Sequence, residues 1–166
     1  ATKRAAKKLA EVLKTKTLEE LEGQLFEGEY IGVTDKMGSD KKNPISHVAY
    51  SYAVHVAIMD ENKKVIKVVA AHDVGRVINP KACQGQIEGG VVMGLGYGVS
   101  ENFIMEDGYV KTKYGTLGLL RATQAPEIEV IMIEKNNPKG LAYGAKGIGE
   151  ISSIPTAPAT AHAAYR

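Results

Sequence analysis

Two glycine-rich segments carry the residues best suited to chemistry. The first, YGAKGIGE at positions 143–150, is typical of a loop and ends in the carboxylate of Glu150. The second, QGQIEGG at positions 84–90, opens a helix and holds two glutamines and one glutamate. A loop carboxylate shielded from water can act as a general base, and N–H groups left free in such a loop can face an anion. By residue type alone, however, a loop glutamate is usually an ordinary surface residue.

The better-known catalytic and nucleotide-binding patterns are absent. Around Lys146 the phosphate-binding P-loop pattern fails, because Ala145 precedes the lysine and Gly147 follows it. The glycines nearby lack the spacing of a dinucleotide-binding fingerprint, and no Gly-x-Ser-x-Gly elbow occurs. Four histidines and one cysteine offer little for a zinc site, so we expect no metal held directly by side chains of this chain.

The composition is that of one ordinary globular domain. The chain has 166 residues, of which 44% are hydrophobic and 24% charged. Its net charge of +2 gives no reason to expect nucleic acid or an anionic membrane as a partner. No apolar run approaches the ~20 residues of a membrane span. The single cysteine, Cys83, excludes an internal disulfide and fits a reducing compartment, so we expect a cytoplasmic protein.

The first 44 residues predict a helical lead-in followed by a loop. Apolar residues recur with helical spacing over positions 3–14. Thr17 and Glu20 have the spacing of a capping box, which predicts a second short helix. Residues 35–44 are polar and predict a solvated loop.

The period changes to two after this loop. Residues 47–59 and 64–71 predict two strands joined by a turn at 60–62, that is, a β-hairpin. On the first strand the apolar set faces one way, and we expect that face to be buried. His55 lies on the other face, where a histidine usually belongs to the sheet surface. The apolar set is Val48, Tyr50, Tyr52, Val54, Val56 and Ile58.

A glycine-rich helix is expected over residues 80–99. Asn79 is a good N-cap and Pro80 suits the first helical position. Six glycines lie between positions 85 and 98, although each costs about 1 kcal/mol in a helix relative to alanine. Glycine allows close approach, either by another backbone or by a bulky cofactor, and the sequence leaves both explanations open.

The rest of the chain completes an α+β prediction. Asp107 and Gly108 predict a hairpin turn, residues 127–133 a further strand, and the segment after Pro155 a final helix. We therefore expect two layers, with a largely antiparallel sheet flanked by helices.

Five motifs, in order, resemble a known family. They are AAHDVGRVINP, GQIEGGVVMGLG, PEIEV, YGAKGIGE and IPTAPATAHA. They resemble the C-terminal part of the molybdenum-binding subunit of the molybdenum hydroxylases, which include xanthine dehydrogenases, aldehyde oxidases and related purine or heterocycle hydroxylases. The resemblance makes 45–166 the motif-bearing α+β region. It makes 1–166 a single C-terminal fragment of a larger molybdenum-cofactor-binding domain, which agrees with a chain that starts at alanine and stops inside a predicted helix.

The resemblance also implies a site. Glu150 corresponds to the family's general base beside the molybdenum, and Gln86 to the glutamine that approaches the pterin. The N–H groups of Gly147, Ile148 and Gly149 would face the anionic cofactor. Glu88 in the same helix would be structural, as a partner for Arg76. Two departures from the family pattern are Met93, where relatives often carry glutamine, and Ile151-Ser152 in place of a double proline.

The resemblance implies a hydroxylase that inserts water-derived oxygen into a purine, heterocycle or aldehyde carbon. It also implies a role in purine metabolism. The cofactor would be molybdenum-molybdopterin, with the cytosine dinucleotide form as an alternative. Partners would be the remainder of the molybdenum-binding subunit, iron–sulfur and FAD subunits or domains, and a small-molecule substrate. The isolated fragment is expected to be inactive. Two other interpretations remain open, a non-enzymatic cofactor-binding module and a protein-interaction module that retains the loop.

A fragment cut from a larger domain should expose surface that was buried in the parent. We expect self-association of this chain through the glycine face of helix 80–99 and its apolar neighbours Val91, Val92 and Leu95.

Overall fold

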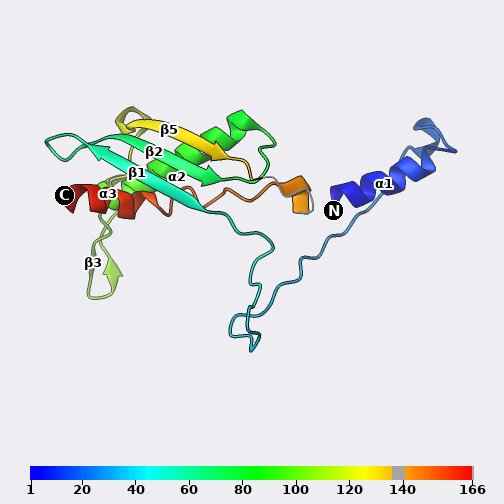
Figure 1. The fold of residues 1–166 in the computed structure, drawn as a ribbon, viewed down its shortest axis with the longest axis horizontal. Helices are drawn as coiled ribbons and strands as arrows, with labels where there is room; N and C mark the ends of the chain where they lie inside the picture. The colour runs from blue at the N-terminus through cyan, green and yellow to red at the C-terminus, as the bar shows by residue number, and fades with distance from the viewer. Residues whose placement is uncertain (136–140, 166) are drawn as a thin grey trace. The chain divides into compact units, whose positions relative to one another are not determined.

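The structure is a computed structural model that describes residues 1–135 and 141–165. It divides into two compact units, residues 1–48 and residues 49–166 (Figure 1). No helix within the described ranges is both long enough and apolar enough to cross a membrane.

The first unit begins with the predicted helix, α1 (Thr2–Val12). The predicted capping box also forms, because the Thr17 N–H donates to Glu20 Oε2 at 2.8 Å and the Glu20 N–H donates to Thr17 Oγ1 at 3.3 Å. The helix that it caps is a single 3₁₀ turn, η1 (Glu19–Leu21), shorter than the sequence suggested. The turn ends at its C-cap, Glu22, and Gly23 after it has a left-handed φ of 78°, a conformation that favours glycine.

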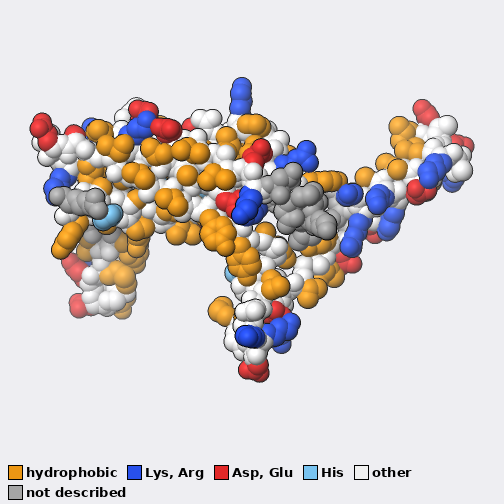
Figure 2. All heavy atoms as spheres, in the orientation of Figure 1, with side chains coloured by type: hydrophobic (Ala, Val, Ile, Leu, Met, Phe, Trp, Pro, Cys, Tyr) orange, Lys and Arg blue, Asp and Glu red, His pale blue; other side chains and the backbone are white. Residues whose placement is uncertain are grey.

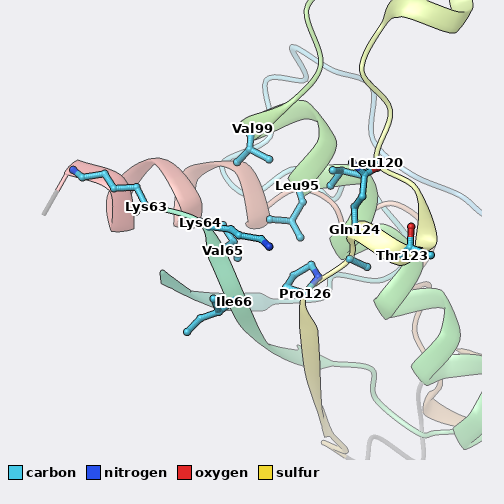
Figure 3. Close-up of a pocket in the computed structure, with 11 residues that line it drawn as sticks. Lys63, Lys64, Val65, Ile66, Leu95, Val99, Leu120, Thr123, Gln124 and Pro126 are labelled. Carbon is cyan, nitrogen blue, oxygen red and sulfur yellow. The ribbon is translucent and has the colours of Figure 1, made fainter. Parts of the chain in front are cut away.

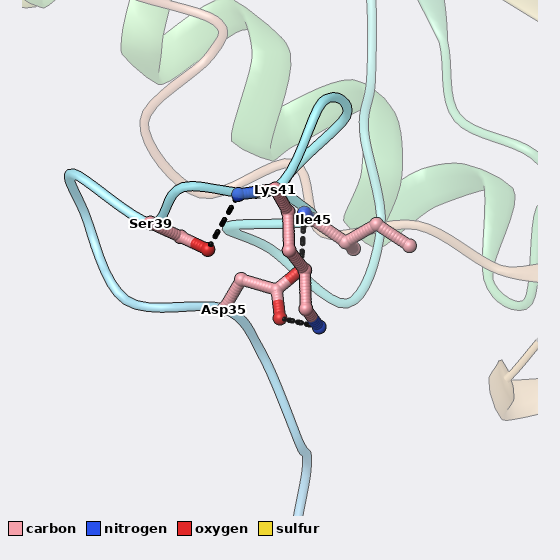
Figure 4. A network of polar contacts seen from close by, with 4 residues as sticks. All are labelled: Asp35, Ser39, Lys41 and Ile45. Carbon is pink, nitrogen blue, oxygen red and sulfur yellow. Dashed lines mark hydrogen bonds and ion pairs between the residues drawn. The ribbon is translucent and has the colours of Figure 1, made fainter.

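The polar loop after residue 34 is closed by one carboxylate (Figure 4). Asp35 pairs with Lys41 Nζ at 2.5 Å through one oxygen and accepts the Ile45 N–H at 2.8 Å through the other. The Lys41 side chain, together with the Ile45 amide, holds the pKa of Asp35 below its usual value. The loop is therefore a defined hydrogen-bonded turn as well as a solvated surface.

The second unit is built on a three-stranded sheet in the order β1-β2-β5. The predicted hairpin pairs β1 (Ala53–Met59) with β2 (Val65–Asp73) in antiparallel fashion, but the first strand is shorter than predicted, because residues 47–52 lie outside it. The strand β5 (Glu127–Ile133) joins β2 in parallel, which the strand pattern alone did not specify. A separate small hairpin, β3 (Met105–Glu106) with β4 (Tyr109–Val110), turns at Asp107 and Gly108 as predicted.

Two helices cover one face of this sheet. The helix α2 (Pro80–Val99) has the predicted N-cap, with the Ala82 N–H donating to Asn79 Oδ1 at 3.1 Å. The helix α3 (Thr156–Tyr165) follows Pro155. Short 3₁₀ turns lie between these elements: η2 (Tyr114–Thr116), η3 (Ala122–Gln124) and η4 (Leu141–Gly144). The two-layer α+β prediction is thereby confirmed, with a core of Val68, Ala70, Val74, Cys83, Ile87, Val91 and Leu95.

One prediction about the sheet is wrong. The aliphatic side chains of the first strand face solvent, with Val54, Val56 and Ile58 exposed by 66%, 53% and 42%. His55, expected on the sheet surface, is only 8% exposed. The helices pack on the His55 side of the strand, where the neighbouring side chains of Ala53 and Ala57 are small and leave room for them. Alternation showed that the strand has two faces, but not which face the helices cover.

The predicted self-association surface on α2 is also wrong. Val91 and Leu95 are fully buried in the core, and Val92 is half-buried. Gly90, Gly94 and Gly98 are covered by α3 and the turn that precedes it, whereas Gly85 and Gly89 stay open. Most of the predicted surface is therefore not available for association.

Candidate functional site

The two glycine-rich segments meet in space. Gln86, two turns into α2, donates from Nε2 to the carbonyl oxygen of Gly149 at 3.0 Å. A groove of about 530 Å³ opens beside this contact. It is lined by Gly85, Gln86, Gly89, Gly90, Met93, Gly149, Glu150, Ser153 and Ile154. The predicted residues Gln86, Gly149 and Glu150 therefore share one groove, whereas Gly147 and Ile148 lie outside its lining.

Five of the six glycines of α2 fall into two sets, and the sixth, Gly96, faces the side chain of Glu101. A Cβ on Gly90 or Gly94 would collide with Ser152 or with the Ser153 carbonyl, and one on Gly98 would come within 2.9 Å of Thr160 Oγ1. These three glycines allow α3 and the preceding turn to pack against the helix. Gly85 and Gly89 differ, because a Cβ on either would meet nothing within 4 Å. They leave space on the groove side of the helix that internal packing does not use.

The loop is joined to the end of β2 by backbone contacts. Gly75 and Ala145 form an isolated antiparallel bridge. The Lys146 N–H donates to the Val74 carbonyl at 3.1 Å, and the Arg76 N–H donates to the Gly144 carbonyl at 3.0 Å. Gly75 has a left-handed φ of 65°, and a Cβ there would collide with the Gly144 carbonyl. The HDVGR and GAKGIGE motifs are thus joined to each other by backbone hydrogen bonds.

The tip of the loop keeps its amides available. Within the described part of the chain, no acceptor is bonded to the N–H groups of Gly147, Ile148 or Gly149. Ile148 packs its side chain against the core, which fixes the middle of the tip. A second groove, of about 400 Å³, lies on this side of Gln86 and includes Ile148, Gly149, Arg76 and Asn79. Two of the residues with free N–H groups, Ile148 and Gly149, line this groove together with an arginine, which makes it suited to an anion.

Glu150 lies at the rim of the first groove. Its carbonyl oxygen accepts from the Ser153 N–H at 3.0 Å and from Ser153 Oγ at 2.9 Å, so the turn after it fixes its backbone. Its side chain is exposed. The described residues of this chain therefore hold Glu150 in place without shielding it from water.

Other residues of the two motifs have structural roles. Glu88 accepts a hydrogen bond from Gln84 Nε2 at 2.7 Å, and no ion pair joins it to Arg76 among the described residues, so that expected pairing is wrong. Ser152 is buried against Gly90, where only a small side chain fits. Met93, one of the two departures noted in the sequence, is exposed and lines the groove.

Sequence reasoning missed a buried histidine pair. His55 Nε2 and His72 Nε2 are 2.7 Å apart, and His55 Nδ1 is 2.9 Å from Thr156 Oγ1. His72 Nδ1 is buried and has no partner among the described residues. Burial, with the neighbouring His72, lowers the pKa of His55 to about 4, and burial also lowers that of His72. Both rings are therefore neutral at pH 7.

A further groove, of about 570 Å³, lies away from Gln86 and Glu150 (Figure 3). It is formed by residues 63–66 and 123–126 with Leu95, Val99 and Leu120. Leu95 and Val99 belong to the C-terminal half of α2, whereas Gln86 lies in its N-terminal half. None of the predicted site residues lines it.

Comparison with known proteins identifies the class. Residues 1–126 match the molybdopterin cofactor-binding domain family, and the chain belongs to this family. The loop at 144–150 lies beyond the matched residues.

Curated relatives are molybdenum enzymes. Over 125 residues the chain is 34% identical to a probable xanthine dehydrogenase subunit of Bacillus subtilis, an alignment that covers 72% of this chain and 17% of that protein. Over 106 residues it is 30% identical to an aldehyde oxidoreductase molybdenum-binding subunit of Escherichia coli K12, covering 61% of this chain and 14% of that protein. The chain thus spans less than a fifth of the length of these relatives.

Solved structures agree. The aldehyde oxidoreductase of Desulfovibrio gigas superimposes with a TM-score of 0.55 and 28% identity, over 72% of this chain and 13% of that one. CO dehydrogenase from Oligotropha carboxidovorans gives a TM-score of 0.63 at 23% identity, over 76% and 16%, and shows the shared fold. The relatives agree with membership in the molybdopterin cofactor-binding domain family.

Proposed function

We propose that this chain is part of the molybdenum-binding subunit of a hydroxylase that inserts water-derived oxygen into a carbon of a purine, a related heterocycle or an aldehyde. The observation that carries the proposal is the contact between Gln86 and Gly149. It joins the two glycine-rich motifs at one groove, which has Glu150 at its rim.

The residues present fit a bulky anionic cofactor. Gly85 and Gly89 contribute no side chain to the groove, and the amides of residues 147–149 have no partner among the described residues. Gln86 uses its Nε2 within the protein, which leaves its Oε1 as an acceptor. When bound, the molybdenum-molybdopterin group, in its simple or cytosine dinucleotide form, supplies the redox chemistry of oxygen insertion.

In this proposal Glu150 is the general base. Its carboxylate accepts a proton from the reacting hydroxyl group and later releases it to water. The turn stabilised by Ser153 fixes the backbone of Glu150, so that little motion is needed for the transfer. The exclusion of water that strengthens such a base would come from the rest of the subunit.

The proposal includes partners that lie outside this chain. Electrons would leave through iron–sulfur and FAD subunits or domains, and the complex would be cytoplasmic. Because this chain covers only a small part of its relatives, we expect the isolated chain to have no hydroxylase activity.

The decisive test is Glu150→Gln in the holoenzyme that contains this chain. Glutamine keeps the shape and hydrogen bonding of the side chain but cannot take up the proton. We expect turnover to fall by at least ~10²-fold, the low end for removal of a general base, with molybdenum content unchanged. Steady-state hydroxylation and metal analysis of the same preparation measure both quantities.

Gln86→Ala is the comparison variant. It removes the bond to the Gly149 carbonyl, so we expect lower molybdenum content and normal turnover per molybdenum. A wild-type rate for Glu150→Gln at full occupancy would show that Glu150 is not the base. Normal metal content in Gln86→Ala would remove Gln86 from the cofactor-binding residues.

A further inference from the structure

An ion pair joins the two motifs through their side chains. Asp73, at the end of β2, and Lys146, in the glycine-rich loop, are 73 positions apart in the sequence. Their Oδ2 and Nζ atoms lie 2.5 Å apart. Both side chains are largely buried, with 12% of Asp73 and 20% of Lys146 exposed. Such a pair is screened by salt much less than an exposed one.

Each partner is held by further contacts. The Gly75 N–H donates to Asp73 Oδ1 at 3.1 Å, so both carboxylate oxygens are engaged. Lys146 Nζ also lies 5.9 Å from the ring centroid of Tyr52, within range of a cation–π contact. Burial alone would raise the pKa of Asp73, but the bonds from Lys146 and Gly75 and the charges of Lys146 and Lys135 outweigh it and lower the pKa. Asp73 is therefore ionised at neutral pH.

The loop needs such a restraint because of its sequence. Glycines occupy positions 144, 147 and 149, and glycine loses more conformational freedom on ordering than any other residue. Beyond Lys146 the chain reaches Glu150 in four residues. At the near end of this stretch the Asp73–Lys146 pair acts together with the bridge between Gly75 and Ala145. At the far end the Gly149 carbonyl is held by Gln86.

We propose that Asp73 and Lys146 are positioning residues whose ion pair holds the loop 144–150 in the conformation that presents Glu150 to the groove. This inference rests on the proposed function, since it assigns the pair a role in placing the general base. Lys146 acts through Asp73 and through the loop backbone, so its charge is used within the protein.

The first experiment measures amide hydrogen exchange in the whole chain of 166 residues. The variants are Asp73→Asn, which keeps an acceptor for the Gly75 N–H, and Lys146→Met, which keeps much of the apolar stem. We expect the backbone amides at positions 76 and 146, which form the bridge to the loop, to exchange ~10-fold faster, while the amides of Val91 and Leu95 in the core are unchanged.

Glu129→Gln is the matched control. It removes a carboxylate from an exposed ion pair with Lys67, 2.8 Å long, on the same sheet and away from the loop. We expect wild-type exchange at the loop bridge in this variant. Unchanged exchange at Arg76 and Lys146 in both test variants, or equal acceleration in the core, would overturn the proposal.

The second experiment uses the holoenzyme. Asp73→Asn and Lys146→Met should lower kcat by ~10- to 100-fold with little change in KM or molybdenum content, because a displaced base slows the chemical step. The exchanged pair, Asp73→Lys with Lys146→Asp, should recover at least part of the loss. A recovery no better than the single variants, with the fold intact, would count against the pairing.

The two proposals can fail separately. If Glu150→Gln keeps a wild-type rate while the loop amides respond to Asp73→Asn, the ion pair restrains the loop but Glu150 is not the base, which overturns the positioning role. If Glu150→Gln is inactive and the loop amides do not respond, Glu150 remains the base and the ion pair does not position it.

Discussion

His55 and His72 meet inside the second unit and connect both layers. Their Nε2 atoms are 2.7 Å apart, and His55 reaches Thr156 of α3 through Nδ1 at 2.9 Å. One proton can lie between the two Nε2 atoms, so one ring must accept through a neutral nitrogen. If both rings were protonated, two N–H groups would face each other. The contact therefore depends on at least one neutral histidine.

This requirement makes stability depend on pH. The pKa of His55 falls from its ordinary value of 6.5 to about 4 in the folded chain, and that of His72 is also lowered. Below pH 6.5 the unfolded chain binds protons that the folded chain does not, so the free energy of unfolding decreases as pH falls toward 4. For His55 alone we expect a loss of about 3 kcal/mol over this range, since one pKa unit is worth about 1.4 kcal/mol.

Urea unfolding of the chain at a series of pH values between 7.5 and 4 measures this slope. His55→Gln keeps a polar side chain at the site but cannot titrate, so its stability should change less over the same range. An equal slope in the wild type and in His55→Gln would show that other groups cause the pH dependence.

Residues of the site differ in how well sequence could find them. Gln86 and Glu150 could be proposed from the sequence because each lies in a contiguous motif that resembles a known family. The Asp73–Lys146 and His55–His72 pairs depend on strand register and loop path, which residue types do not reveal. Once the register is known, the histidine pair follows, because His55 lies opposite Ala70 and His72 opposite Ala53, which places both histidines on one face.

The glycines of the helix α2 are not equivalent, because they have different surroundings. The sequence predicted the helix and its N-cap. It also predicted that the glycines allow close approach, but it left open whether another backbone or a cofactor approaches them. The structure assigns Gly90, Gly94 and Gly98 to packing against α3 and its preceding turn, and leaves Gly85 and Gly89 facing open space. Helical spacing alone could not divide them, because the division depends on where α3 returns to the helix.

Alanine substitutions test this division. Gly89→Ala adds a methyl group into free space and removes the helix cost of glycine, so we expect the free energy of unfolding to rise by up to about 1 kcal/mol. Gly94→Ala would collide with the Ser153 carbonyl and should lower it by about 1–3 kcal/mol. Urea unfolding of the two variants of the chain measures both changes.

The holoenzyme separates stability from cofactor binding. If the space beside Gly89 admits the cofactor, Gly89→Ala should lower molybdenum content although it stabilises the chain. Full molybdenum content in Gly89→Ala would argue that this part of the groove is not used. Loss of stability in Gly89→Ala would instead contradict the assignment of free space.

At the level of the whole molecule, the sheet carries an uncovered apolar face. Figure 2 shows hydrophobic side chains gathered over the strands of the sheet. Those that are exposed on the outer side include Val54, Val56 and Ile58 of β1 and Ile131 and Ile133 of β5. The sequence predicted the strands and the α+β class but assigned burial to the β1 face that is open, because strand periodicity carries no information on where helices pack.

The outer face of the sheet, rather than α2, is therefore where the isolated chain should self-associate. Contiguous apolar surface of this kind favours association, and β1 is in addition an edge strand without a charged residue between Ala53 and Met59. Val56→Lys places a charge in the middle of this face, and we expect it to reduce association and apolar-dye binding without loss of fold.

Tyr97→Lys is the matched control, since Tyr97 is an exposed apolar residue of the helical layer. Sedimentation velocity at ~10–100 μM, a range in which weak contacts between proteins become populated, distinguishes the variants. A monomeric wild-type chain that binds no dye would contradict the prediction, and so would an equal effect of the two lysine variants.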